Sequence, residues 1–320
     1  MALDHYVSRV HLKQFISRDM NGLMYAISKR DLKRFTPKPK DVCRIEEGST
    51  NSYLRENRSI ETFLLDVEPN YDTALANLLS GQIDAQTIYV LSGFLSYICV
   101  CSPTAMRLNS EPLKQIIEQT ARILDAQKVF PNPPESLAGK SISSLLESSA
   151  VQVNVDPKYP QALGIAAVEQ YAAIFGNSRW EILNNGFDDC PFFTSDYPAA
   201  VERNNGSPMP NRIMPLTPAL AIRVCPNLGT NRRPSKMNFS NFRCQSLDLA
   251  RNAVVDLNRL IVRCAENTVF FSKDHSWIDD FVKENARFSI QSKTQSIPMG
   301  TGSLHRSSLE VTETPKDTTC

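Results

Sequence analysis

The sequence lacks the motifs of nucleotide-dependent enzymes and zinc peptidases. It contains only 12 glycines and four histidines in 320 residues. None of them forms a phosphate-binding Gly-rich loop, a dinucleotide-binding glycine pattern or an H-E-x-x-H motif. A Gly-x-Ser-x-Gly elbow is also missing, which disfavours a serine hydrolase. We therefore expect no nucleotide cofactor.

Long apolar runs and paired cysteine motifs are missing as well. The longest apolar run, residues 88–100, is too short and too polar to cross a bilayer, and the first residues contain no signal-peptide core. The eight cysteines form no C-x-x-C pair, and most lie in apolar segments, where a thiol packs as a small hydrophobic group. These features predict a reduced cytoplasmic protein with no membrane partner.

The sequence lacks an excess of charge of either sign: basic and acidic residues nearly balance, and the formal net charge is +1. The distribution is nevertheless uneven. Between residues 203 and 243 the chain has no acid and seven basic residues: Arg203, Arg212, Arg223, Arg232, Arg233, Lys236 and Arg243. Such a segment is more often a solvated face than a phosphate-binding surface, and both interpretations stay open. Together with the basic stretch 29–40, it makes nucleic acid a hypothetical partner.

Helical periodicity dominates residues 60–175. An apolar stripe predicts a helix from Ile60 that is interrupted at Glu68-Pro69 and ends at Gly81. Asp84 is the predicted N-cap of a second helix, Ala85 to Cys101, which is apolar on all sides and therefore buried. Further helices are predicted at about 111–129, 143–153 and 160–175.

Short strand patterns mark the start of the chain and its second half. Strands are predicted at 22–28, 179–184, 192–195, 212–218, 220–225 and 269–272, and helices at 245–266 and 277–282. The fold class is α+β: a largely helical N-terminal half packs against a small, mostly antiparallel sheet. That sheet is built from the N-terminal hairpin and the strands after residue 178.

A single domain is predicted over residues 1–288, with a helical part at 60–175 and a β-rich part at 178–272. Residues 289–320 are rich in Ser and Thr with few large apolar side chains, so we expect a disordered tail. Within the domain, residues 191–198 read Pro-Phe-Phe-Thr-Ser-Asp-Tyr-Pro, an apolar run that ends in a carboxylate before a proline. This is typical of a buried strand that delivers Asp196 to a sheet edge.

Five blocks in this order resemble DUF4238, a bacterial family of unknown function, over roughly residues 5–272. The blocks are His5-Tyr6-Val7 with Leu12-Lys13 and Phe15; Asn21-Gly22-Leu23 with Ser28-Lys29-Arg30; Glu68; Trp180 with Phe193-Thr194-Ser195-Asp196 and Pro198; and Pro215 to Pro218 with Leu257-Asn258, Leu260 and Phe270-Phe271-Ser272.

The chain departs from the family pattern at two places. Ser8 and Arg9 replace a Pro-Gln pair, and Cys101 stands where the family usually has an arginine. An anion-binding role of that arginine would pass here to Arg107 or be lost. The resemblance itself supplies no chemistry.

The polar residues at matched positions are His5, Glu68, Asp196 and Asn258. Oxygen-rich sites suit hard cations, so Glu68 and Asp196 are candidate ligands of Mg²⁺ or Mn²⁺, with His5 as a third catalytic residue. Such an ion would activate water on a phosphodiester. The candidate substrate-binding residues are Arg107, Ser195, Asn258, Lys29 and Arg30.

Two classes of function remain open. The first is a metal-dependent nuclease or phosphodiesterase built on His5, Glu68 and Asp196. The second is a non-catalytic sensor or binding protein, in a defence or toxin context, in which these side chains are structural. Asp196 would then end a strand in an Asx-turn, His5 would satisfy a buried carbonyl, and Asn258 would bridge a helix to a loop.

Overall fold

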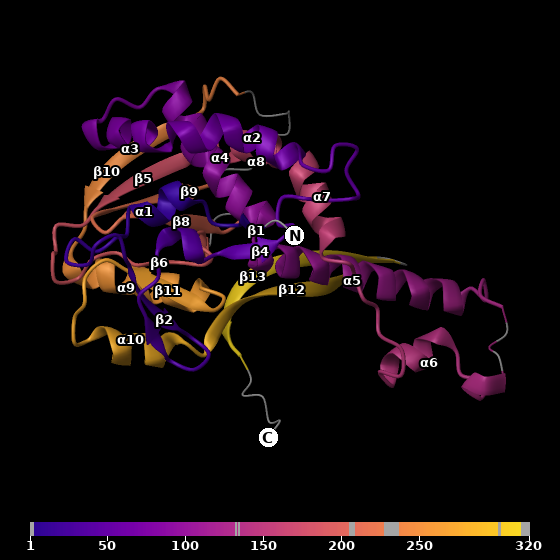
Figure 1. The fold of residues 1–320 in the computed structure, drawn as a ribbon. Coiled ribbons are helices and arrows are strands. Elements are labelled where there is room, and N and C mark those ends of the chain that lie inside the picture. Colours follow the sequence, from indigo (N-terminus) through magenta and orange to yellow (C-terminus); the bar gives the residue numbers. More distant parts are fainter. Residues whose placement is uncertain are drawn as a thin grey trace.

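A five-stranded sheet forms the central layer (Figure 1). The computed structural model describes residues 3–131, 133, 135–204, 209–226, 237–299 and 302–314. The strand order is β10-β5-β9-β8-β7, and β10 is parallel to β5 whereas the other neighbours are antiparallel. The strands are β5 (Arg179–Asn184), β7 (Ala200–Glu202), β8 (Asn211–Thr217), β9 (Leu220–Cys225) and β10 (Arg243–Asp248).

A second, four-stranded antiparallel sheet has the order β3-β2-β11-β6. It joins the N-terminal hairpin, β2 (Tyr25–Ser28) and β3 (Arg34–Phe35), to β6 (Thr194–Ser195) and β11 (Thr268–Phe271). Strands β1 (Leu3–His5) and β4 (Arg44–Glu46) form a separate two-stranded antiparallel sheet, and they flank the β2–β3 hairpin in the sequence. The α+β class is confirmed, and the strands are divided among several sheets.

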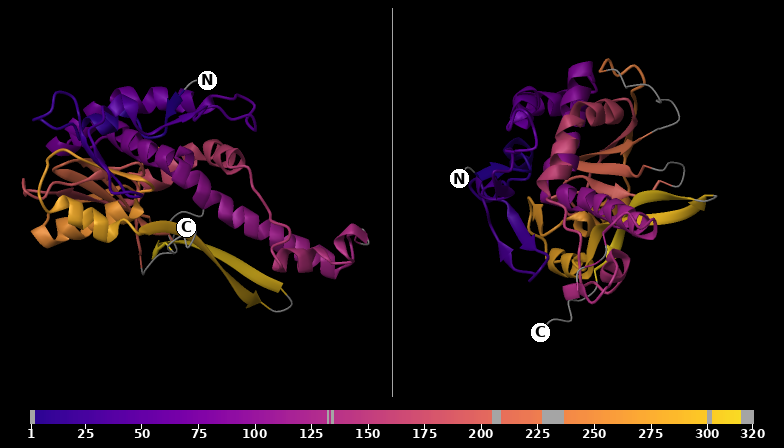
Figure 2. Two further views of the ribbon diagram at one scale, coloured as in Figure 1. Left: turned by 60° about the horizontal axis from the view of Figure 1, so that its bottom comes forward. Right: turned by 90° about the vertical axis from the view of Figure 1, so that its right-hand side faces the viewer.

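Helices α3, α4 and α8 cover one face of the five-stranded sheet (Figures 1 and 2). The helices are α1 (Arg9–Lys13), α2 (Ser59–Val67), α3 (Tyr71–Ser80), α4 (Ala85–Cys101), α5 (Pro103–Ala126), α6 (Ile142–Glu147), α7 (Lys158–Ala166), α8 (Val168–Gly176), α9 (Arg251–Cys264) and α10 (Ile278–Asn285). Short 3-10 turns occur at Pro39–Asp41, Glu68–Asn70 and Glu135–Leu137.

The predicted start and end signals around α4 are confirmed. Gly81 has a φ of 74°, the left-handed conformation that ends α3. The carboxylate of Asp84 accepts the backbone N–H of Thr87 at 2.7 Å and caps α4. Because nearly every side chain of α4 is apolar, the helix is buried on all sides.

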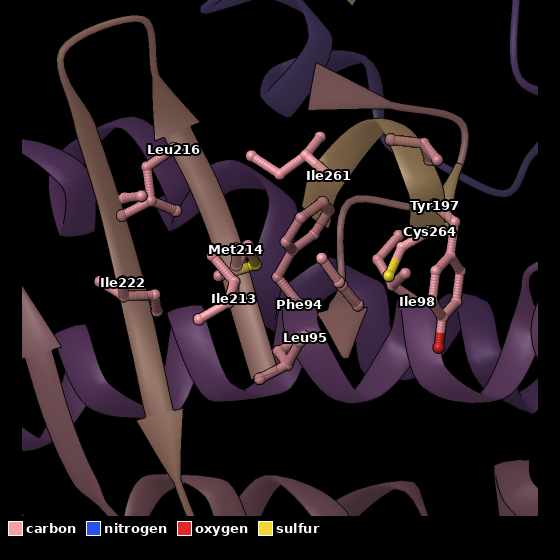
Figure 3. Close-up of a cluster of buried hydrophobic side chains, with 14 of the residues drawn as sticks. Phe94, Leu95, Ile98, Tyr197, Ile213, Met214, Leu216, Ile222, Ile261 and Cys264 are labelled. Atoms are coloured by element: carbon pink, nitrogen blue, oxygen red, sulfur yellow. The ribbon is translucent and has the colours of Figure 1, made fainter. Parts of the chain in front are cut away.

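Helix α4 is also the centre of the hydrophobic core. Figure 3 shows Phe94, Leu95 and Ile98 of α4 packed toward side chains of the central sheet and of α9. The partners labelled there include Met214 and Ile222 from the sheet, and Ile261 and Cys264 from α9. One core thus includes side chains of both the helical and the β-rich segments.

Several predicted helix boundaries are wrong, and two of them have a clear physical reason. Residues 245–248 were predicted as helix but belong to β10, whose side chains are largely exposed at the sheet edge, and α9 begins only at Arg251. Pairing with β5, a tertiary contact, decides this conformation. Helix α5 starts at Pro103 rather than near 111, because Ser102 caps it and a proline is compatible with the first turn.

The prediction of a disordered tail over residues 289–320 is wrong for residues 289–299 and 302–314. Strands β12 (Phe288–Met299) and β13 (Gly302–Glu313) form an antiparallel hairpin that extends from the body in the same direction as α5 (Figure 2). Lys29 donates to the carbonyl of Phe288 at 2.8 Å, and Arg107 donates to that of Ile290 at 3.1 Å. These contacts to distant residues hold a segment whose own composition is that of a tail. Residues 300–301 and 315–320 lie outside the described residues.

Across the described residues, no single helix combines the length and apolarity needed to span a membrane. One bent pair, Ser59–Ser80 with Ala85–Cys101, meets the criteria jointly by length and composition, with a bend of 118°.

Substitution of Asp84 tests how much the N-cap of α4 stabilises the fold. We expect Asp84→Ala to lower the free energy of unfolding by about 1 kcal/mol, because it removes the acceptor of the Thr87 N–H. The measurement is urea denaturation followed by circular dichroism. Asp66→Ala, at an exposed position of α2, is the control and should change the value by less than about 0.5 kcal/mol.

Candidate functional site

The candidate site is a cavity of about 450 Å³ between β1 and α2. Both His5 and Glu68, two of the three predicted catalytic residues, line it. Its walls are Leu3, Asp4, His5, Arg9, Ser49, Glu61, Leu64, Leu65, Glu68 and Pro69. A pocket of this volume accommodates a small organic molecule.

The charged groups of the cavity fall into two sets. Arg58 binds both Asp4, at 3.2 Å, and Glu61, so both carboxylates have an ion-pair partner within the protein. Glu68 and Arg9 make no ion pair or side-chain hydrogen bond with any residue that the structure describes. Opposite charges without protein partners therefore line one cavity.

His5 is a half-buried residue of the cavity lining. Its Nε2 is buried without a hydrogen-bond partner in the described chain, and its carbonyl oxygen accepts the hydroxyl of Tyr97. Burial lowers the pKa of the imidazole, and the positive charges of Arg44 and Arg9 lower it further, although the backbone of Lys40 and Pro39 acts in the opposite direction. The lowered pKa favours the neutral form of the ring.

Asp196, the third predicted catalytic residue, does not line this cavity. Its two carboxylate oxygens accept the backbone N–H groups of Glu266, Asn267 and Thr268 at 2.9, 2.7 and 3.1 Å. Burial raises the pKa of the carboxyl to about 6, although these N–H groups and the charge of Lys29 act in the opposite direction. The carboxylate organises the turn between α9 and β11.

The structure does not bring the predicted metal ligands into one metal-binding group. Among the described residues, no three His, Cys, Asp or Glu side chains are arranged to hold an ion. Glu68 faces the cavity, and Asp196 is held by the backbone of another turn. The expectation of Mg²⁺ or Mn²⁺ therefore stays a prediction.

Ser195 and Asn258 have local structural partners. Ser195 is fully buried in β6, and its hydroxyl oxygen accepts the N–H of Tyr197 at 3.1 Å. Asn258 of α9 is also fully buried, accepting from the N–H of Phe193 and donating to the carbonyl of Pro191. The amide thus bridges a helix to the segment before β6.

The predicted basic ligands also lie apart from the cavity. Lys29 is buried and donates to the carbonyls of Ala265 and Phe288 at 2.5 and 2.8 Å; burial lowers its pKa to about 8. Arg107 forms a two-bond ion pair with Glu266, at 2.8 and 2.7 Å. Arg30 is exposed on the surface.

The basic segment 203–243 does not form one continuous surface. Arg212 is paired with Val224 and Arg223 with Ile213, so the two arginines point to opposite faces of the sheet. Arg223 binds Glu181 at 2.5 Å and Glu202 at 3.0 Å. The candidate phosphate ligands Arg232, Arg233 and Lys236 lie outside the described residues.

Sequence reasoning missed two residues. Arg9 was noted only as a departure from the family pattern, yet it lines the cavity. His11 is fully buried, with its ring nitrogens bonded to the hydroxyls of Tyr71, at 2.9 Å, and Thr194, at 2.8 Å. Two histidines six residues apart were the available signal, but separating a ligand-facing histidine from a core histidine needed the packing.

The core histidine generates a pH prediction. Burial lowers the pKa of His11 from 6.5 to about 3, so the unfolded chain binds a proton that the folded chain excludes. Neutral His11 therefore makes a contribution to the free energy of unfolding that is constant above about pH 6.5. As the pH falls below this value the contribution decreases, and the loss amounts to about 3 kcal/mol by pH 4.5. Between pH 7 and 4.5, the free energy of unfolding of His11→Gln should fall by about 3 kcal/mol less than that of the wild type. Gln82→Ala, an exposed position without a titrating side chain, serves as the control and should retain the wild-type slope.

The chain was compared with known proteins. Residues 4–275 match the family described as "Protein of unknown function (DUF4238)". No curated protein and no solved structure matches the chain. The family match covers most of the sequence, begins within β1, includes α2 and the cavity between them, and ends before α10. The chain is therefore a member of the DUF4238 family.

Proposed function

We propose that the protein is a non-catalytic sensor or binding protein whose cavity between β1 and α2 takes a small zwitterion. The ligand class is an amino acid, or an amino acid-like molecule, with an apolar side chain. The observation that carries this proposal is the pair of unneutralised opposite charges, Glu68 and Arg9, in the same cavity.

The charge pattern suits such a ligand. An ammonium group would bind the carboxylate of Glu68, and a carboxylate would bind the guanidinium of Arg9, which offers parallel N–H donors. Arg58 pairs with Asp4 and Glu61, so Glu68 and Arg9 are the lining charges that have no ion-pair partner among the described residues. A ligand with one charge of each sign would supply a partner to each of these two groups.

The apolar part of the cavity supports the same class. Leu65 is 70% exposed and Leu3 is 51% exposed, although both line a concave surface. Covering these side chains with an aliphatic or aromatic ligand would contribute about 25 cal/mol per Å² of apolar area.

Three probes that differ in one charge each test the assignment. Isothermal titration calorimetry would compare leucine, N-acetylleucine, which lacks the ammonium, and leucinamide, which lacks the carboxylate. We expect leucine to bind at least about tenfold more tightly than either analogue, because each analogue leaves one protein charge unpaired. Equal affinities for the three probes, or no binding of leucine, would contradict the proposal.

Two substitutions locate the binding groups. Glu68→Gln should weaken leucine at least about tenfold without weakening N-acetylleucine, and Arg9→Gln should do the same for leucine without weakening leucinamide. Glu56→Gln and Arg55→Gln, exposed positions outside the cavity, are the matched controls and should bind as wild type.

A metal-dependent nuclease or phosphodiesterase is the second candidate. One observation favours it: His5 and Glu68, two of its three proposed catalytic residues, line the same cavity. An ion held there would polarise a phosphate and activate water. Asp196 lies outside the cavity, so Glu68 is the residue to substitute in its test.

The nuclease test uses plasmid DNA and single-stranded RNA with Mn²⁺, followed by gel electrophoresis. Under this second proposal, wild type cleaves at least one substrate and Glu68→Gln loses at least about tenfold in rate, as for removal of a metal ligand. Glu56→Gln is again the control. Absent cleavage, or equal cleavage by wild type and Glu68→Gln, would eliminate this second candidate.

We further propose a bacterial origin, as the family resemblance implies, and a cytoplasmic location. All seven cysteines in the described part of the chain are free, and most are buried. Free thiols persist in reducing compartments, which supports this location.

A further inference from the structure

A second cavity, independent of the one between β1 and α2, lies where α9, α10 and the start of β12 meet. Its volume is about 660 Å³. Four of its seven lining residues are basic, and the full set is Arg259, Arg263, Asp280, Lys283, Glu284, Asn285 and Arg287. The α9 residues fall within the family match, whereas residues 280–287 follow it.

Arg263 is held in a fixed orientation in this cavity. Its Nε donates to Oδ1 of Asn285 at 2.7 Å. Asn285 is only 2% exposed, and its amide nitrogen donates to the carbonyl of Phe281, so the acceptor is itself fixed. The guanidinium carbon lies 4.0 Å from the ring centroid of Phe288, so one face of the group is stacked. Its terminal nitrogens make no hydrogen bond with any described residue.

The other arginines of the cavity have carboxylate partners. Arg259 binds Asp256 of the preceding helical turn, and Arg287 binds Glu313 at 3.1 Å. Arg263 is bound to a neutral amide and an aromatic ring instead. Burial lowers the pKa of its guanidinium, and the nearby charges of Arg259 and Arg287 lower it further. An anion at its terminal nitrogens would offset this repulsion.

The acidic members of the cavity narrow the class of anion. Asp280 and Glu284 alternate with the basic side chains, so the cavity offers no continuous positive track for a long polyanion. The local positive centre is the guanidinium of Arg263, with the ammonium of Lys283 in the same cavity. A compact, multiply charged group fits this pattern better than a polymer.

We propose that this cavity binds a small phosphate-bearing anion, with the terminal nitrogens of Arg263 donating two parallel hydrogen bonds to it. Lys283 supplies a second positive charge. Phosphate oxygens match the planar fork of a guanidinium, which explains why an arginine is held there by Asn285 and Phe288.

The test uses pyrophosphate as the probe, with the full chain, in isothermal titration calorimetry at constant ionic strength. We expect Arg263→Gln and Arg263→Lys each to weaken binding at least about tenfold, because both lose the two-donor fork. Lys283→Gln, at an exposed position that does not endanger folding, should weaken binding severalfold. Arg251→Gln, on the same helix but outside the cavity, should bind as wild type.

Circular dichroism would confirm that each variant folds, and the Lys283 variant keeps the test valid if an Arg263 variant does not. Pyrophosphate that fails to bind wild type, or binds all folded variants equally, would overturn the proposal. A 20-nucleotide single-stranded RNA forms the second arm. Binding of this RNA alone, with a steep salt dependence, would overturn the assignment to a small anion.

Discussion

The buried carboxylate of Asp196 is the interaction on which the β-rich half depends. A charged group that is 3% exposed is costly to bury unless it is hydrogen-bonded, and three backbone N–H groups satisfy it. Those N–H groups belong to the turn that connects α9 to β11. Since Asp196 directly follows β6, a single side chain joins two segments 70 residues apart.

This link positions several other features. Strand β11 pairs with β6 on one side and with β2 on the other, so the N-terminal hairpin is held by the same turn. Lys29, which follows β2, then reaches the carbonyl of Phe288 and anchors the hairpin of β12 and β13. Asp196 and Lys29, which the sequence suggests as site residues, thus connect the sheets to each other and to the C-terminal hairpin.

Both proposed sites are places where such compensation is incomplete. In the first cavity, Arg58 pairs with two of the carboxylates, and Glu68 and Arg9 have no ion-pair partner in the described chain. In the second cavity, Arg259 and Arg287 have carboxylate partners and Arg263 does not. Buried charges such as Asp196 need partners within the protein, whereas a charged side chain that lines a cavity without such a partner is a candidate for ligand binding.

The α+β class, the family, the caps and limits of α4, and the burial of the stretch before Asp196 could all be predicted from the amino-acid sequence. These features follow from local rules: a glycine in the left-handed conformation, an N-cap carboxylate and an apolar run. Tertiary structure decided that residues 243–248 form a strand, that residues 288–313 form a hairpin, and that Glu68 shares a cavity with His5 and Arg9 while Asp196 does not. An edge strand or a charged side chain is stabilised by a partner that lies far away in the sequence. Residue type and local spacing do not identify that partner.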